Sequence, residues 1–180
     1  MINMKVVSKM IITLLLLGLP LVSQAQHGHH NGGENGFTSE FTEMIQHYFA
    51  MKDALVESDA DQAVEAASHM QMKLESIGEH RLEGDEHMEW MQTYGKLEAQ
   101  LADVSESGEL EEIRTHFYAL SETLIEGVKV FGVEGVVYHQ YCPMAFNNEG
   151  GGWLSSEDQV MNPYMPDTML RCGEVIERIE

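Results

Sequence analysis

Soft metal ligands are concentrated in two short segments near the C-terminus. Residues 138–144 read Tyr-His-Gln-Tyr-Cys-Pro-Met, and residues 161–173 follow after a glycine-rich stretch. Together they hold the chain's only two cysteines, one histidine and four methionines. Thiolate, thioether and imidazole are ligands that soft ions such as monovalent copper or silver prefer over oxygen. The expected metal ligands are Cys142, Cys172, Met144, His139, Met169 and Met165, with Met161 as a further thioether.

The same two cysteines also suit a structural disulfide. Paired cysteines outside the cytoplasm are commonly oxidised, and closing the loop of about 30 residues between Cys142 and Cys172 would contribute roughly 3–4 kcal/mol in the chain-entropy model. A disulfide does not require His139 or Met144 beside it, whereas a monovalent copper site uses such groups, and thioethers remain usable where free thiols are lost. The residues by themselves leave the disulfide and the metal site as open alternatives.

Residues 1–25 have the pattern of an export signal. Lys5 and Lys9 supply a positive region, residues 10–22 are largely apolar, and a Ser-Gln-Ala cleavage site ends at Ala25. The apolar run of about 13 residues is shorter than the roughly 18 that a membrane span needs. We therefore expect cleavage near Ala25, a periplasmic or secreted protein, and no membrane insertion after cleavage.

The net charge of the chain limits the classes of partner that it is expected to bind. The sequence has 30 acidic and 10 basic side chains, a formal net charge of −20 at pH 7. Such a field repels phosphate backbones and anionic lipid headgroups and concentrates cations near the surface. We therefore expect a metal ion, and neither nucleic acid nor a membrane surface, as a partner. The alternative is that the carboxylates only keep an exported protein soluble.

Residues 26–36 are rich in glycine and asparagine and carry three histidines, His27, His29 and His30. Without a large apolar side chain such a segment is expected to be a flexible linker. Clustered imidazoles in a linker can hold a metal loosely. The other interpretation is a polar linker with incidental histidines.

Four apolar stripes with helical spacing begin at Phe37. Short links between long helices favour antiparallel neighbours. The sequence therefore predicts an all-α, up-down four-helix bundle, with residues 37–180 forming one domain. The expected helices cover about residues 38–57, from a cap at Asp59 to Gly78, 88–104 and 110–128.

From about residue 136 the pattern changes, because prolines and a glycine triplet interrupt any long helix. We expect an irregular C-terminal cap that carries the Cys/Met/His cluster and several aromatic side chains. Within it, a short turn of helix is predicted after Ser155 and another helix over residues 169–179.

No pattern in the sequence indicates catalysis. The chain has no Gly-x-Ser-x-Gly elbow, phosphate-binding glycine loop, Cys-x-x-Cys pair or His-Glu-x-x-His helix, and the Glu-x-x-His pairs of a di-iron bundle do not repeat cleanly. His69, Met70 and Met72 lie within one helical turn, but only Met70 is on the apolar stripe, where core packing accounts for it. We expect a non-catalytic protein.

Several motifs in the tail resemble those of a bacterial family, domain of unknown function 3347. They are Tyr-Cys-Pro-Met-Ala at 141–145, Trp-Leu-Ser at 153–155, Asn-Pro-Tyr at 162–164 and Met-Leu-x-Cys-Gly at 169–173, preceded by Arg114-x-x-Phe117-x-x-Leu120-Ser121. The family occurs as a stand-alone exported protein and as a C-terminal appendage of periplasmic adaptor subunits of copper and silver efflux pumps. The resemblance implies a helical domain associated with metal handling in the periplasm.

Two hypotheses follow. In the first, the protein is a periplasmic chaperone or sequestering protein for monovalent copper or silver, linked to heavy-metal efflux, and its protein partner is an efflux adaptor or another copper-handling protein. In the second, it is a non-catalytic interaction module with a Cys142–Cys172 disulfide and an aromatic docking surface.

Overall fold

The computed structural model describes residues 31–180, with side chains from residue 36 onward. The predicted export signal and the three histidines His27, His29 and His30 lie outside the described residues. None of the helices in the described part is long and apolar enough to cross a membrane.

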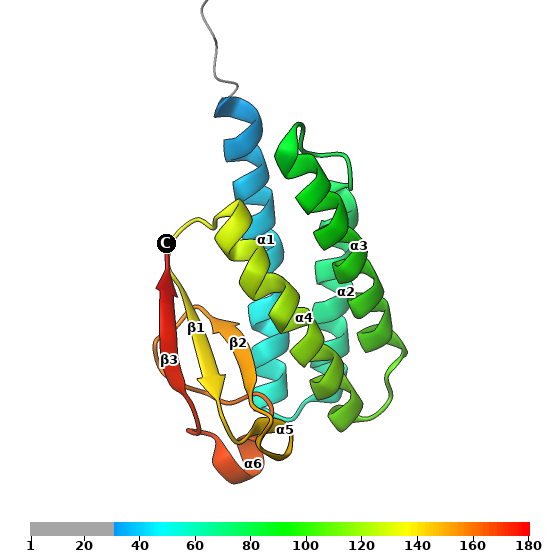
Figure 1. Cartoon of the computed structure of the whole chain (residues 1–180). Helices are drawn as coiled ribbons and strands as arrows, with labels where there is room; N and C mark the ends of the chain where they lie inside the picture. Colours follow the sequence, from blue (N-terminus) through cyan, green and yellow to red (C-terminus); the bar gives the residue numbers. More distant parts are fainter. Residues whose placement is uncertain (1–30) are drawn as a thin grey trace, which may run out of the picture.

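Four long helices come first in the chain, and a small sheet with two short helices follows them (Figure 1). This confirms the predicted bundle. The helix α1 begins seven residues before the expected position and so includes the end of segment 26–36. The elements are α1 (Asn31–Val56), α2 (Ala60–Ile77), α3 (Asp85–Glu106), α4 (Leu110–Phe131), β1 (Val137–Cys142), α5 (Ala145–Asn148), β2 (Gly151–Ser155), α6 (Pro166–Met169) and β3 (Glu174–Ile179).

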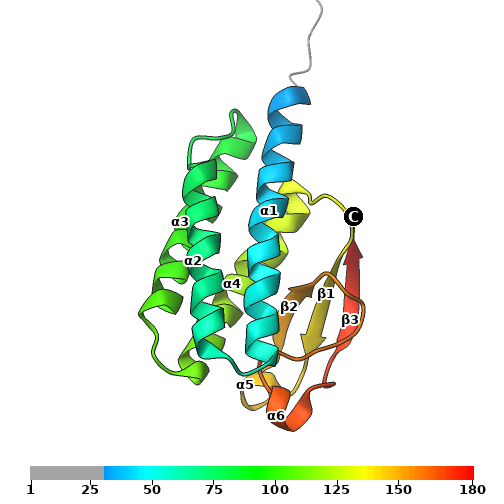
Figure 2. The same ribbon diagram turned by 180° about the vertical axis from the view of Figure 1, so that it is seen from behind.

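The helix ends follow from local chemistry. Asp59 caps α2 by accepting a hydrogen bond from the Gln62 backbone N–H at 3.0 Å, which satisfies one of the donors left free at a helix start. Gly78 ends α2 and Gly132 ends α4, both with φ above +70°, a conformation that glycine adopts without steric cost. Short links between the four long helices bring consecutive helices side by side in alternating directions (Figures 1 and 2).

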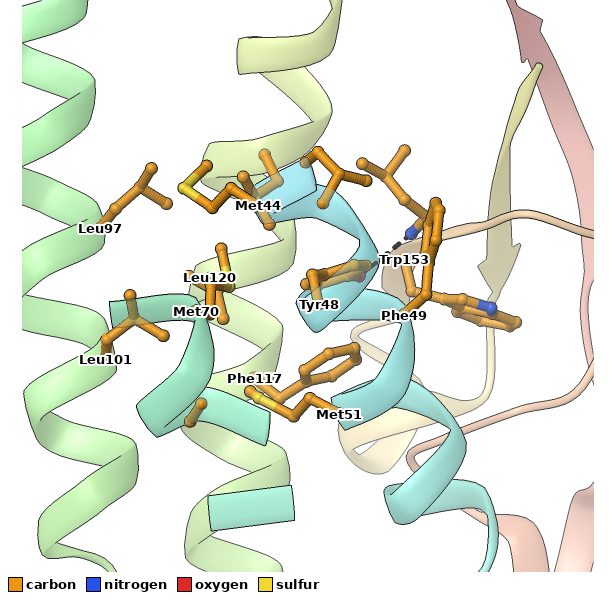
Figure 3. Close-up of a cluster of buried hydrophobic side chains, with 14 of the residues drawn as sticks. Met44, Tyr48, Phe49, Met51, Met70, Leu97, Leu101, Phe117, Leu120 and Trp153 are labelled. Carbon is orange, nitrogen blue, oxygen red and sulfur yellow. Dashed lines mark hydrogen bonds between the residues drawn. The ribbon is translucent and has the colours of Figure 1, made fainter. Parts of the chain in front are cut away.

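Side chains from all four helices meet in one core. Near the start of α1, Phe37 and Phe41 pack with Trp90 and Phe131 in edge-on contacts with ring centroids 4.8–6.0 Å apart. Further along, fully buried methionine and leucine side chains lie between the helices, and Tyr48 stacks on an aromatic ring of α4 (Figure 3). Burial of these apolar side chains is the main force that stabilises such a bundle.

The tail corrects the expectation of an irregular cap. It forms a three-stranded antiparallel sheet in the order β2-β1-β3, packed against the bundle (Figure 1). Residues 169–179, predicted as a helix, instead end α6, turn at Gly173 with φ of 137° and continue as β3. The helical turn expected after Ser155 is a bend. Pairing with β1 satisfies the backbone hydrogen-bonding groups of β3. The local sequence of β3 alone did not reveal this pairing.

Residues 156–173, here called the strap, connect β2 to β3 and cross the sheet on the way (Figure 2). The buried amide of Gln140 on β1 donates to the carbonyls of Glu157 at 2.9 Å and Gln159 at 3.3 Å. Asn162 donates to the Cys172 carbonyl at 3.1 Å and accepts from the Tyr164 N–H at 2.9 Å. These bonds fix the strap over the strands.

Buried polar groups join the bundle to the sheet. The Tyr48 hydroxyl lies 2.7 Å from the Ser121 hydroxyl and accepts a hydrogen bond from the Leu154 N–H at 3.1 Å (Figure 3). The side chain of Arg114, only 4% exposed, donates to the Pro163 carbonyl at 3.1 Å. The bundle therefore holds both β2 and the strap.

Candidate functional site

The structure brings the two cysteines together. Cys142 is the last residue of β1 and is fully buried, and Cys172 follows α6 and is half-buried. Both are free thiols, and they lie close enough that Cys142 is the main influence on the pKa of Cys172. Antiparallel pairing of β3 with β1 places the end of the strap beside the end of β1, because Tyr141 pairs with Glu174. Two thiols far apart in sequence thus form one pair.

The groups around the two thiols change the pKa of Cys172. The neighbouring Cys142 sulfur raises the pKa of the Cys172 thiol, and burial raises it further. The backbone N–H of Met144 acts in the opposite direction, because it stabilises a thiolate at Cys172. A metal ion binds the thiolate form, so it has to displace protons here, and binding should strengthen as the pH rises.

Met144 is the methionine whose backbone adjoins the thiol pair. It follows Pro143, precedes α5, and its side chain is 42% exposed. The Met144 N–H lowers the pKa of Cys172, so the Met144 backbone lies beside that thiol.

The other expected methionine ligands belong to the strap. The Met169 carbonyl accepts from the Cys172 N–H at 2.9 Å, so these two residues share a turn. Met165 lies before α6, where its N–H donates to the Asn162 side chain at 3.2 Å and its side chain packs against the core. Met161 is half-buried earlier in the strap. Met169 is thus the nearest of these to a thiol along the chain.

His139 does not join the thiols. The register between β1 and β2 runs without a break from Tyr138 to Cys142, and neighbouring side chains on a strand point to opposite faces. His139 and Cys142, three positions apart, therefore lie on opposite faces of β1. The His139 ring faces α4, where a Cβ added at Gly152 would lie 2.9 Å from its Nε2 and 3.4 Å from the Glu122 carboxylate.

The environment of His139 favours its neutral form. Burial lowers the pKa of His139 and the charge of Lys129 lowers it further, while Glu177 opposes both. The Glu177 carboxylate is 3.9 Å from Nδ1, too far for a hydrogen bond, and Nδ1 is a buried atom without a partner among the described residues. The imidazole is therefore held neutral at the interface between sheet and bundle.

Over the described part of the chain, no three His, Cys, Asp or Glu side chains gather at one point. The candidate centre is accordingly a two-sulfur site with thioethers nearby. Asn162, which the sequence did not indicate as part of the site, helps to position Cys172 by donating a hydrogen bond to its carbonyl. The signal for it was the Asn-Pro dipeptide, a common turn former.

Comparisons with known proteins identify a family. None of the curated proteins and none of the solved structures matches the chain. One family model, described as Protein of unknown function (DUF3347), matches residues 44–135, just over half of the chain. The match covers most of the bundle and ends before β1 and both cysteines. The chain therefore belongs to the DUF3347 family of proteins of unknown function.

Proposed function

We propose that this protein binds monovalent copper or silver at Cys142 and Cys172 and carries or sequesters the ion outside the cytoplasm. The observation that supports this proposal is the meeting of two free thiols from β1 and the strap. Thiolate sulfur selects monovalent copper over harder ions. Two sulfurs also suit an ion that accepts a low coordination number.

Binding forms two sulfur–metal bonds and releases the protons of the two thiols. The thioether of Met144, or that of Met169, supplies a third and weaker ligand. His139 is left out of the proposed ligand set, because it faces α4 from the other side of β1. The Cys172 thiol is half-buried and Met144 is exposed, which leaves a route for transfer of the ion to another protein.

The acidic surface supports the same role. A formal net charge of −20 raises the local concentration of cations and the rate at which they meet the site. The proposed protein partner is a periplasmic efflux adaptor or another copper-handling protein. Export is part of the proposal: the purified periplasmic form should begin near Gln26, which N-terminal sequencing of that form would test.

A disulfide between Cys142 and Cys172 is the second candidate, because the same contact between thiols favours oxidation. The aromatic docking surface, which the second hypothesis combined with this disulfide, has less support. Trp153 and Tyr164 are 0% and 5% exposed, so these two aromatic side chains belong to the core. The second candidate is therefore a structural crosslink between β1 and the strap.

Silver titration separates the two candidates. Under the first, the reduced protein binds one silver ion, and a free metal concentration a thousandfold above Kd raises the free energy of unfolding by about 4 kcal/mol. Cys142→Ser and Cys172→Ser should each abolish tight binding, because a hydroxyl is a hard and weakly acidic substitute for a thiol. Met144→Leu keeps the volume, removes the sulfur and should lower affinity with little change in the metal-free fold.

Met88→Leu is the matched control, since Met88 is an exposed methionine of α3 and lies outside the sheet and the strap, and the affinity of this variant should equal that of the wild type. The disulfide candidate expects a different result. Both Cys→Ser changes would then destabilise the metal-free protein by about 3 kcal/mol, and Met144→Leu would leave silver uptake unchanged. A reduced wild type that takes up no silver would refute the proposed function.

A further inference from the structure

Two histidine side chains meet between α1 and α2, outside the thiol pair. His47 of α1 and His69 of α2 face each other with ring centroids 5.7 Å apart and ring planes tilted by 54°. They border a shallow hollow of about 160 Å³, which Ala50, Gln62, Glu65 and Ala66 complete. Small alanine side chains at its floor leave both rings accessible.

The turn between the helices explains the pairing. His47 and His69 are equally far in sequence from Ser58, which has φ of 57° in the tight turn between α1 and α2. In an antiparallel helix pair, residues at equal distance from the turn lie at the same height. Both helices are held by the core on their other faces, so the two rings are presented from rigid backbones.

The charged side chains around the two rings are compatible with a bound cation. Lys73, one turn after His69, is the nearest cation, and it forms an ion pair with Glu43, one turn before His47. Glu65 lies one turn before His69 and lines the same hollow. Burial lowers the pKa of His47, and the charges of His69 and Lys73 lower it further while Glu43 opposes them.

We infer that His47 and His69 form a site for a divalent borderline ion of the zinc or copper class. Imidazole is the ligand that these ions share. The two rings fill two coordination positions, and water fills the others. This site differs in ligands, location and ion from the thiol pair, and it does not depend on the function proposed there.

The test is zinc titration followed by NMR of the histidine ring protons, which report each imidazole separately from any binding at the thiols. His27, His29 and His30 are replaced by alanine throughout, so that the N-terminal segment does not compete. The rings of His47 and His69 should shift together and saturate at one equivalent of zinc. His116, a lone half-exposed ring on α4, should not shift in that range.

Single substitutions decide whether the two rings act as one chelate. Loss of an outer-shell partner alone costs about 10–100-fold in metal affinity, so loss of a ligand should cost at least tenfold. His47→Gln should therefore weaken the zinc response of His69 by about tenfold or more, and His69→Gln should do the same to His47. His116→Gln should change neither. The inference is overturned if the zinc response of His69 is unchanged in the His47→Gln variant. It is also overturned if the two rings shift only at zinc concentrations at which His116 shifts as well.

Discussion

At the scale of single residues, the sheet decides which side chains can meet. His139 and Cys142 are three positions apart, a spacing that would place them on one face of a helix. On β1 the same spacing places them on opposite faces. His139 consequently faces α4, whereas Cys142 lies on the other face of β1, beside Cys172 of the strap. Spacing rules for metal ligands therefore depend on the element that carries them.

The buried position of His139 gives the protein a pH dependence. A histidine whose folded-state pKa lies below its unfolded value of about 6.5 takes up a proton on unfolding in that interval. The pKa of His139 is lowered in this way, so the free energy of unfolding should fall as the pH is lowered through about 6.5. His139→Gln should reduce this slope. Urea unfolding at several pH values between about 7.5 and 5.5 would measure it.

His80→Gln is the control for this prediction, because the His80 side chain is 68% exposed. Its slope should match that of the wild type. The pKa of His47 is also lowered, so some slope should persist in the His139 variant. An unchanged slope in His139→Gln would show that the neutral ring is not stabilised by its position between sheet and bundle.

At the scale of elements, Arg114 connects α4 to the strap. Its Nε donates to the Pro163 carbonyl at 3.1 Å, and its other nitrogens bind Ser58 at 3.1 Å and Glu111 at 2.7 Å. Arg114→Met keeps an apolar stem and removes every donor. The buried Pro163 carbonyl then loses its partner, which should cost about 1–3 kcal/mol of stability and should speed amide hydrogen exchange in the strap.

Arg171 provides the comparison for Arg114. It lies in the same strap, is exposed, and donates to the Val160 carbonyl at 3.2 Å. Arg171→Met should change stability by less than about 0.5 kcal/mol, as surface substitutions usually do. Equal effects of the two changes would contradict the assigned role of Arg114 as the anchor of the strap.

The four long helices could be predicted from the sequence, because an apolar stripe that repeats over about five turns is a strong local signal. The sheet could not. The short strand β3 has exposed residues at all but its last position, so it carries no alternating pattern, and its pairing with β1 is a contact between distant segments. The cysteine pair was proposed as a common site from composition, while the exclusion of His139 required knowledge of the strand.

At the scale of the whole molecule, bundle and sheet share one core. The family match ends at residue 135, yet Trp153 and Leu154 of β2 are fully buried. A chain that stops after Gly135 would expose the surface of α4 and α1 against which β2 packs. We expect such a fragment to lose cooperative unfolding and to bind a hydrophobic dye, in contrast to the full chain. A fragment with a sharp unfolding transition and no dye binding would show that the bundle is independent of the sheet.

Tyr48 tests the same junction without removing any part of the chain. Tyr48→Phe leaves the buried Leu154 N–H without its acceptor, and an unpaired buried donor costs about 1–3 kcal/mol. Chemical unfolding would measure the loss. Tyr94→Phe is the matched change, because the half-buried Tyr94 hydroxyl has no hydrogen bond to the described side chains, and stability should stay within about 0.5 kcal/mol. Similar losses in both variants would argue against the junction.

The contact between Cys142 and Cys172 turns the end of the chain into a ring whenever the two sulfurs share a metal or a covalent bond. β2 and the strap up to Cys172 lie inside that ring. A protease cut anywhere between the two cysteines would then open a loop without releasing a fragment, and the nicked protein would stay in one piece until a chelator or a reductant freed it. The choice between those two reagents reports which crosslink the protein carries.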